Sequence, residues 1–163
     1  MIFVTVGSQK FQFNRLLIKL DELVEHGIIT QKIFAQIGNS DYIPQQYSFK
    51  CFLDKEEFVD IMKECDIVIT HGGTGTIINA IKQGKKVIAI PRLVQYGEHV
   101  DNHRIQLIEQ FTKRNFIYGL QDCDELETAL NGIKNTEFNT YTSNTYKYIE
   151  SIEKFLKKEF LWS

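Results

Sequence analysis

Short apolar runs rich in β-branched residues alternate with amphipathic segments along the chain, and this alternation limits the possible folds more than any other feature. The clearest unit is Asp66–Thr70, a predicted buried strand, followed by the glycine-rich loop His71–Thr76 and a helical segment that ends at Gly84. Runs of the same kind occur at Ile2–Val6 and Lys86–Ile90. Strands that alternate with helices of about 10–15 residues form right-handed βαβ units and a parallel sheet. We therefore predict an α/β fold, a Rossmann-like parallel sheet with helices on both faces.

The remaining elements follow from the same apolar spacings. Weaker strands are predicted at Lys32–Ile37, Ser48–Phe52 and Phe116–Tyr118. Helices are predicted from the spacing of apolar residues and from their caps. They are Phe13–His26 closed by Gly27, Lys55–Cys65 with an Asp54 and Glu57 capping box, Glu98–Lys113, and Asp124–Lys134 with Asp122 or Asp124 as its cap.

The chain of 163 residues is expected to form one domain, residues 1–163. The tail from Tyr141 is predicted to be a final helix with an apolar end at Phe160–Ser163. This helix (residues 141–163) could pack on its own sheet, dock on a partner protein or lie on an anionic membrane surface. The sequence leaves these three alternatives open.

Composition excludes several classes of protein. The 19 Lys and Arg against 21 Asp and Glu give a net charge of −2, so no nucleic-acid partner is expected. No apolar run is long enough to span a membrane, and the first residues lack the pattern of a signal peptide, which predicts a cytoplasmic protein. Cys51, Cys65 and Cys123 are scattered, which favours reduced thiols over disulfides or a zinc site.

The loop His71–Thr76 is the most informative site motif. Three of its glycines lie within four residues, between a strand and a helix. Glycine allows close approach of a ligand, and a helix start presents unpaired N–H groups and a positive dipole end. The loop is no Walker A motif, and Ile78 replaces the third glycine of GxGxxG. A phosphate or diphosphate site is predicted, with a tight turn that binds nothing as the alternative. The predicted binding residues are Gly72, Gly73, Thr74, Gly75 and Thr76.

Two other loops follow predicted strands, and ligands of open parallel sheets bind beyond the carboxyl ends of the strands. The turn at Gly7, Ser8 and Gln9 could give further donors to the same ligand, although an ordinary turn has the same composition. The second of these loops includes a polar segment with the candidate residues Glu98, His99, Asp101, Asn102 and His103. These side chains offer both donors and acceptors, which suits sugar hydroxyls better than a metal, because HExxH is not matched. A solvated helix start is the alternative interpretation of this segment.

His71 directly follows a predicted strand and could be a base, a phosphate contact or a structural bridge. The residue alone favours a structural role. Ser8 together with His71 suggests a hydrolase only superficially, because no GxSxG elbow is present. His71 is nevertheless the one residue of the chain that we consider as a candidate for catalysis.

Four motifs in order resemble the C-terminal, donor-binding domain of glycosyltransferase family 28: VTVGSQ, FLDKEEFVDIMKECDIVITHGGTGTI, GKKVIAIPR and GEHVDNH, over about Ile2 to Gly119. The stand-alone subunits of bacterial capsule and exopolysaccharide synthesis and the dolichol-linked GlcNAc transferase are the most similar members. The resemblance implies one half of a GT-B enzyme that holds a UDP-sugar. A membrane-associated partner would supply the half that binds a lipid-linked saccharide acceptor, which places the heterodimer at the inner face of the membrane. No cofactor and no metal are implied.

The resemblance also assigns roles to single residues. Gly7, Ser8 and Gln9 match the turn near the donor phosphates, and His71–Thr76 match the loop that faces them. Phe52 and Leu53 match the pair that flanks the uracil. The positions that match the contacts to the donor sugar are Asn102 and His103, with Glu98, His99 and Asp101 close by.

One departure from the family pattern concerns the ribose. Family members carry a glutamate in the helix after the glycine loop, and this chain has Asn79 there. An amide bonds a diol without charge assistance, so weaker donor binding is expected. The departure favours, as the alternative, a non-catalytic enhancer subunit that activates its partner. An epimerase or reductase is disfavoured because Tyr42, Tyr47 and Tyr96 each lack a lysine four residues on.

Overall fold

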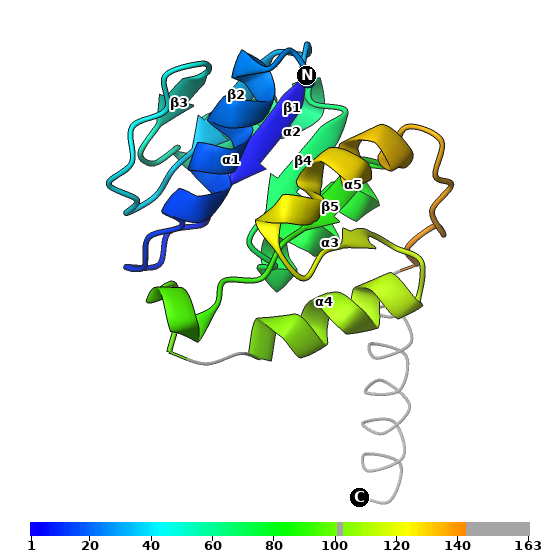
Figure 1. Ribbon diagram of the computed structural model, residues 1–163. Helices are drawn as coiled ribbons and strands as arrows, with labels where there is room; N and C mark the ends of the chain where they lie inside the picture. The colour runs from blue at the N-terminus through cyan, green and yellow to red at the C-terminus, as the bar shows by residue number, and fades with distance from the viewer. Residues whose placement is uncertain (101–102, 143–163) are drawn as a thin grey trace, which may run out of the picture.

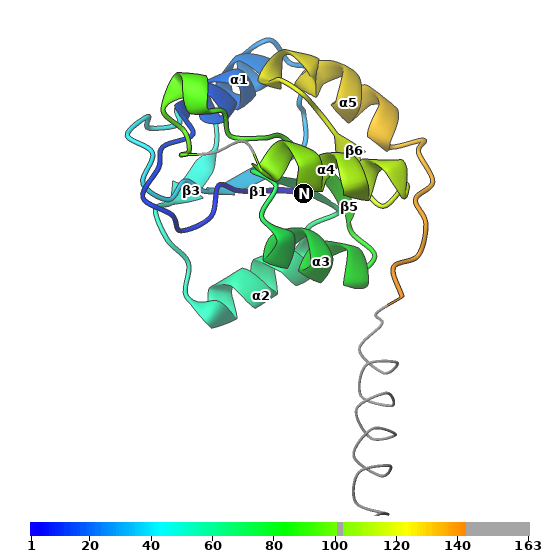
Figure 2. The ribbon, with the colours of Figure 1, turned by 90° about the horizontal axis from the view of Figure 1, so that it is seen from below.

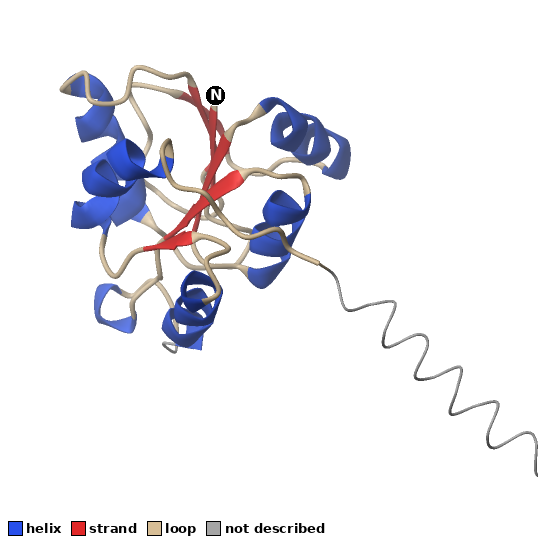
Figure 3. Ribbon diagram, turned by 90° about the vertical axis from the view of Figure 1, so that its right-hand side faces the viewer, coloured by secondary structure: helices blue, strands red, loops and turns tan. Residues whose placement is uncertain are grey.

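A six-stranded parallel sheet lies between two layers of helices in the computed structural model, which describes residues 1–100 and 103–142 (Figures 1 and 3). The strand order is β3-β2-β1-β4-β5-β6, and all five pairings are parallel. This arrangement confirms the predicted α/β Rossmann-like fold. The strands are β1 (Ile2–Thr5), β2 (Ile33–Gln36), β3 (Ser48–Lys50), β4 (Ile67–Thr70), β5 (Lys86–Ala89) and β6 (Tyr118–Gly119).

The helices cover the two faces of the sheet unequally (Figure 2). One core joins a face of the central strands to α1 and α5, and the other joins the opposite face to α2, α3 and α4. The helices are α1 (Asn14–Glu25), α2 (Lys55–Glu64), α3 (Thr74–Lys82), α4 (His103–Lys113) and α5 (Leu126–Ile133), with 3-10 turns η1 (Val94–Tyr96) and η2 (Cys123–Glu125).

Burial on both faces explains why the strands are apolar without interruption. Ile2 and Val4 pack in the core beneath α1 and α5, whereas Phe3 packs in the other core. Each of these three side chains is at most 1% exposed. Successive side chains of a strand point to opposite faces, so a sheet covered on both sides needs apolar residues at every position.

Three predicted helix caps can be compared with the structure. The Asp54 and Glu57 capping box is confirmed at the start of α2. Gly27, with φ +71°, closes α1 in a Schellman arrangement, because the N–H of Ile28 donates to the carbonyl of Leu23. Asp122, rather than Asp124, caps the last helical segment, which begins with the 3-10 turn η2.

Two predicted boundaries are wrong. The helix predicted from Glu98 is, in the described chain, α4 from His103, because Gly97 turns the backbone with φ +66° and Glu98 follows in a loop. The last strand lies slightly later than predicted, since Tyr118 and Gly119 pair with β5. Most of the predicted tail helix lies outside the described residues. Across the described ranges, every helix falls short of the length and apolarity that a membrane span requires.

Candidate functional site

The strand order places the topological switch point of the sheet between β1 and β4. Chain connections run in opposite directions from these two neighbouring strands, and ligands of such sheets bind beyond the carboxyl ends at this switch point. The turn from Gly7 follows β1 and the loop from His71 follows β4. The start of α4 also lies near this edge of the sheet (Figures 1 and 2). Three segments selected from the sequence therefore meet at one place.

The ring of His71 fills the space between two glycines. A Cβ atom added at Gly7 would lie 2.6 Å from His71 Cε1, and one added at Gly73 would lie 2.9 Å from the same atom. Gly7 also has φ +78°, a conformation that other residues adopt only with strain. Close packing around His71 thus requires both glycines, independently of any ligand.

His71 is only 5% exposed, and its chemistry follows from this burial. Nδ1 lies 3.4 Å from the carbonyl oxygen of Thr5. Burial, and then the positive charges of Arg92 and Arg104, lower the pKa of His71 to about 3. The side chain is therefore neutral at physiological pH. A group of such low basicity is poorly suited to act as a general base before ligand binds, which favours the structural alternative for His71.

The glycine loop presents the start of α3. Gly73 is its N-cap and no side chain caps the helix, while the first internal bond runs from the N–H of Ile77 to the carbonyl of Gly73. The preceding N–H groups have no partner within the helix. Thr74 and Gly75 are exposed, so these donors lie at the surface. Asn79 is half-buried one turn later, and its Oδ1 accepts a bond from Gln83 Nε2 at 3.0 Å.

Gln9 links the turn after β1 to the segment after β5. Its Oε1 accepts a bond from Arg104 Nη2 at 3.1 Å and lies 3.2 Å from His99 Nε2. The His99 ring lies against Phe11, with 5.2 Å between the ring centroids. The structure therefore places Gln9 and His99, two of the predicted site residues, beside each other. It also adds Arg104, which directly follows His103 in the first turn of α4 and which the sequence analysis missed.

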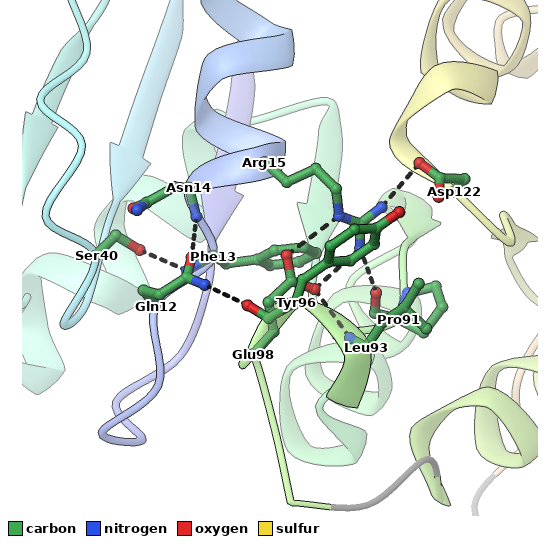
Figure 4. Close-up of polar contacts among 10 residues, drawn as sticks. All are labelled: Gln12, Phe13, Asn14, Arg15, Ser40, Pro91, Leu93, Tyr96, Glu98 and Asp122. Atoms are coloured by element: carbon green, nitrogen blue, oxygen red, sulfur yellow. Dashed lines mark hydrogen bonds and ion pairs between the residues drawn. The ribbon is translucent and has the colours of Figure 1, made fainter.

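Glu98 has a different environment from the one predicted. It is fully buried, and its two carboxylate oxygens accept bonds from Arg15 Nε at 3.1 Å and Nη2 at 3.0 Å (Figure 4). Glu98 also accepts from the N–H of Leu93 at 2.9 Å, and Arg15 donates to Asp122 at 2.9 Å and to the carbonyl of Pro91. These bonds argue against sugar binding by Glu98.

Arg92 is a second functional candidate that the sequence analysis missed. It is fully buried, donates from Nη2 to the carbonyl of Val6 at 2.6 Å, and lies beside the ring of Phe13. Its Nε and Nη1 have no hydrogen-bond partner among the described residues. Burial lowers the pKa of Arg92 to about 10, so it stays charged at neutral pH. Its bond fixes the peptide that precedes Gly7.

The other predicted contacts lie at the margins of this region. Phe52 is 49% exposed just after β3, and Leu53 is half-buried against the core. His103 begins α4 and is exposed, whereas Asp101 and Asn102 lie outside the described residues. Within residues 1–100 and 103–142, no group of three or more His, Cys, Asp or Glu side chains could hold a metal ion.

Comparison with known sequences gives one family. The sequence model described as "Glycosyltransferase family 28 C-terminal domain" matches residues 1–158. The chain is 24% identical over 124 residues to the human UDP-N-acetylglucosamine transferase subunit ALG13, covering 72% of this chain and 11% of the human protein. It is 31% identical over 100 residues to ALG13 of Candida albicans, covering 61% and 30% of the two chains. The chain thus spans a minor part of these relatives.

Comparison with solved structures agrees on the fold. An ALG13 solution structure superposes with a TM-score of 0.60 at 17% identity, over 93% of this chain and 94% of the other. MurG of Acinetobacter baumannii gives 0.57 at 14% identity, over 81% and 41%. A UDP-GlcNAc 2-epimerase from Neisseria meningitidis gives 0.58 at 15% identity, over 96% and 43%. Because an epimerase shares it, the fold alone does not decide the reaction.

Proposed function

The chain belongs to the glycosyltransferase family 28 C-terminal domain family, and from this premise we propose that it is the donor-binding subunit of a two-component glycosyltransferase. The observation that carries the proposal is the meeting of the Gly7 turn and the glycine loop at the switch point between β1 and β4, where α3 begins. The proposed donor is a UDP-sugar. The identity of its sugar, galactose, glucose or N-acetylglucosamine, is left to experiment.

The geometry supports the following reaction. The diphosphate of the donor lies at the start of α3, where free N–H groups and the helix dipole favour negative charge. An acceptor hydroxyl attacks the anomeric carbon, the bond from that carbon to the phosphate oxygen breaks, and UDP leaves with the added charge. Stabilisation of this charge lowers the barrier. The base that takes the hydroxyl proton is assigned to the partner or the interface, because His71 is buried and weakly basic.

A partner is proposed because the curated relatives are named as subunits of a UDP-N-acetylglucosamine transferase. We assign the acceptor half to a membrane-associated subunit that binds a lipid-linked saccharide in capsule or exopolysaccharide synthesis. This assignment places the complex at the inner face of the membrane.

A non-catalytic enhancer is the second candidate. Asn79 replaces a ribose-binding glutamate of the family, and its oxygen already accepts a bond from Gln83. Weak donor binding would fit a subunit that only activates its partner. The two candidates differ in one respect, because only the enzyme needs the glycine loop for turnover.

Calorimetric titration of the purified chain with UDP, UDP-galactose, UDP-glucose and UDP-GlcNAc, with and without magnesium, tests the proposal. Binding is expected, and Thr74→Val is expected to weaken it, because Thr74 lies exposed at the start of α3. Thr30→Val is the matched control, since Thr30 precedes β2 at the opposite edge of the sheet. No binding to the chain or to its co-expressed pair would contradict a donor site.

Turnover by the co-expressed pair separates the two candidates. A Thr74→Val pair that turns over at the wild-type rate would favour the enhancer, and a large loss would favour the enzyme. His71→Ala in the same pair tests the candidate catalytic residue. Unchanged turnover would remove His71 from the chemistry.

A further inference from the structure

Arg104 lies directly beside the start of α3. A Cβ atom added at Gly73, the N-cap of α3, would be 3.8 Å from Arg104 Nη1. One added at Gly72 would be 3.8 Å from the Cβ atom of Arg104. The arginine side chain therefore runs along the glycine loop, and its guanidinium group ends at the N-cap. An anion at the first turn of α3 would lie within reach of both the helix N–H groups and this cation.

Gln9 holds the guanidinium group in this position. Its Oε1 accepts the bond from Arg104 Nη2 at 3.1 Å, while its main-chain oxygen accepts a bond from Asn39 Nδ2 at 2.9 Å. A bond from a cation to a neutral amide is weaker than one from a cation to an anion. A phosphate oxygen can therefore replace the amide oxygen of Gln9 with a gain in binding energy.

Two further positive groups lie near Arg104. Arg92 is buried nearby, and the positive end of the α3 dipole lies at the same loop. The positive charges of Arg92 and Arg104 both contribute to the low pKa of His71, the residue that begins the glycine loop. Arg104 and the start of α3 lie at the glycine loop, and Arg92 lies behind the neighbouring turn at Gly7. This arrangement fits a ligand of high negative charge.

We propose that Arg104 binds the diphosphate of the nucleotide donor, and that Gln9 keeps its guanidinium group over the glycine loop until the diphosphate takes the place of the amide oxygen. The inference rests on the proposed donor site and adds to it a residue and an exchange of partners. A planar guanidinium group can bind two phosphate oxygens at once, which a lysine cannot. The site should therefore distinguish UDP from UMP.

Titration of Arg104→Gln and Arg104→Lys with UDP and UMP tests the inference. We expect Arg104→Gln to weaken UDP binding at least tenfold and UMP binding much less, with Arg104→Lys in between. Arg114→Gln is the matched control, because Arg114 is exposed just after the far end of α4. UDP binding by Arg104→Gln at the wild-type affinity would overturn the inference, as would an equal loss for UMP and UDP.

Gln9→Glu tests the exchange of partners. A carboxylate at this position should retain Arg104 and compete with the diphosphate, so UDP binding is expected to weaken at least tenfold. The losses from Gln9→Glu and Arg104→Gln should not add in the double variant, because both act on one cation. Additive losses would contradict the exchange. If neither the wild-type chain nor its co-expressed pair binds UDP, the proposed function fails as well, whereas wild-type binding with unaffected variants rejects this inference alone.

Discussion

Arg15 and Arg104 each connect the chain that follows β1 to the chain that follows β5, but their partners differ. Arg15 is joined to two carboxylates, Glu98 and Asp122, and to a main-chain oxygen. Arg104 Nη2 is joined to the neutral amide of Gln9 at the edge of the glycine loop. The first arginine is part of a structural ion network, and for the second we propose that a phosphate oxygen replaces the amide oxygen of Gln9.

Polar loop residues near the site divide into a structural group and a group of candidate ligand contacts. Glu98 and His99 are neighbours in the sequence, and both were predicted to contact the donor. Glu98 is buried with its acceptors occupied by Arg15 and Leu93, whereas His99 lies beside Gln9. A buried ion pair with a distant arginine, rather than residue type, therefore sets Glu98 apart from His99.

Removal of Glu98 should give the largest effect on stability. Glu98→Ala leaves Arg15 without its main partner inside the protein, and the loss of one member of a buried pair costs about 3–5 kcal/mol. Urea unfolding measures this loss. Asp60→Ala is the control, because the exposed pair of Asp60 and Lys63 should contribute about 0.5 kcal/mol or less. A stable Glu98→Ala protein that binds UDP normally but binds UDP-sugars more weakly would restore the predicted sugar contact and contradict the structural role of Glu98.

Gly7 allows a test of the packing around His71. Gly7→Ala should cost about 2–3 kcal/mol, because an alanine with φ +78° is strained and its methyl group would overlap the His71 ring. Gly75→Ala is the matched control, since nothing lies within 4 Å of an added Cβ and the residue is in the first turn of α3. Gly75→Ala should leave the free energy of unfolding unchanged or raise it by up to about 1 kcal/mol. Equal effects on the unfolding free energy would contradict the packing argument.

The fold could be predicted from the sequence because its signals are local. The runs at Ile2–Val6 and Asp66–Thr70 and the cap at Asp54 each depend on neighbouring residues, and each is confirmed. The helix predicted from Glu98 is wrong because Gly97 turns the backbone, and the buried Glu98 bonds to Arg15, 83 positions earlier. Local patterns contain no information on such a pairing.

The part of the candidate site that depends on local sequence signals could also be predicted. The glycine loop and the Gly7 turn are local motifs, and the order of strands brings them together. Arg92 and Arg104 were missed because their meaning depends on distant partners, the carbonyl of Val6 and the amide of Gln9. An arginine in a loop or a helix start gives no such signal by itself.

Acid should destabilise the protein through His71. The native pKa of His71, about 3, lies below the unfolded value of about 6.5. The unfolded state therefore binds more protons between these values, and the free energy of unfolding decreases as the pH is lowered. The expected loss between pH 7.5 and pH 5 is about 2 kcal/mol. His71→Asn should flatten this dependence, whereas His26→Asn, at an exposed position, should leave it in place. Parallel curves for wild type and His71→Asn would contradict the assignment.

The smallest expected effect is that of a substitution at Asn79. Its side-chain oxygen accepts a bond from the exposed Gln83, a partner that a ligand can replace. Asn79→Glu should tighten UDP binding about fivefold, because a carboxylate forms charge-assisted bonds to the ribose hydroxyls. The gain should vanish with 2′-deoxy-UDP, which lacks one hydroxyl. A gain that persists with the deoxynucleotide would place residue 79 away from the ribose. A ribose-specific gain would show that the donor site is built on this chain and is limited by one side chain, which favours the enzyme over the enhancer.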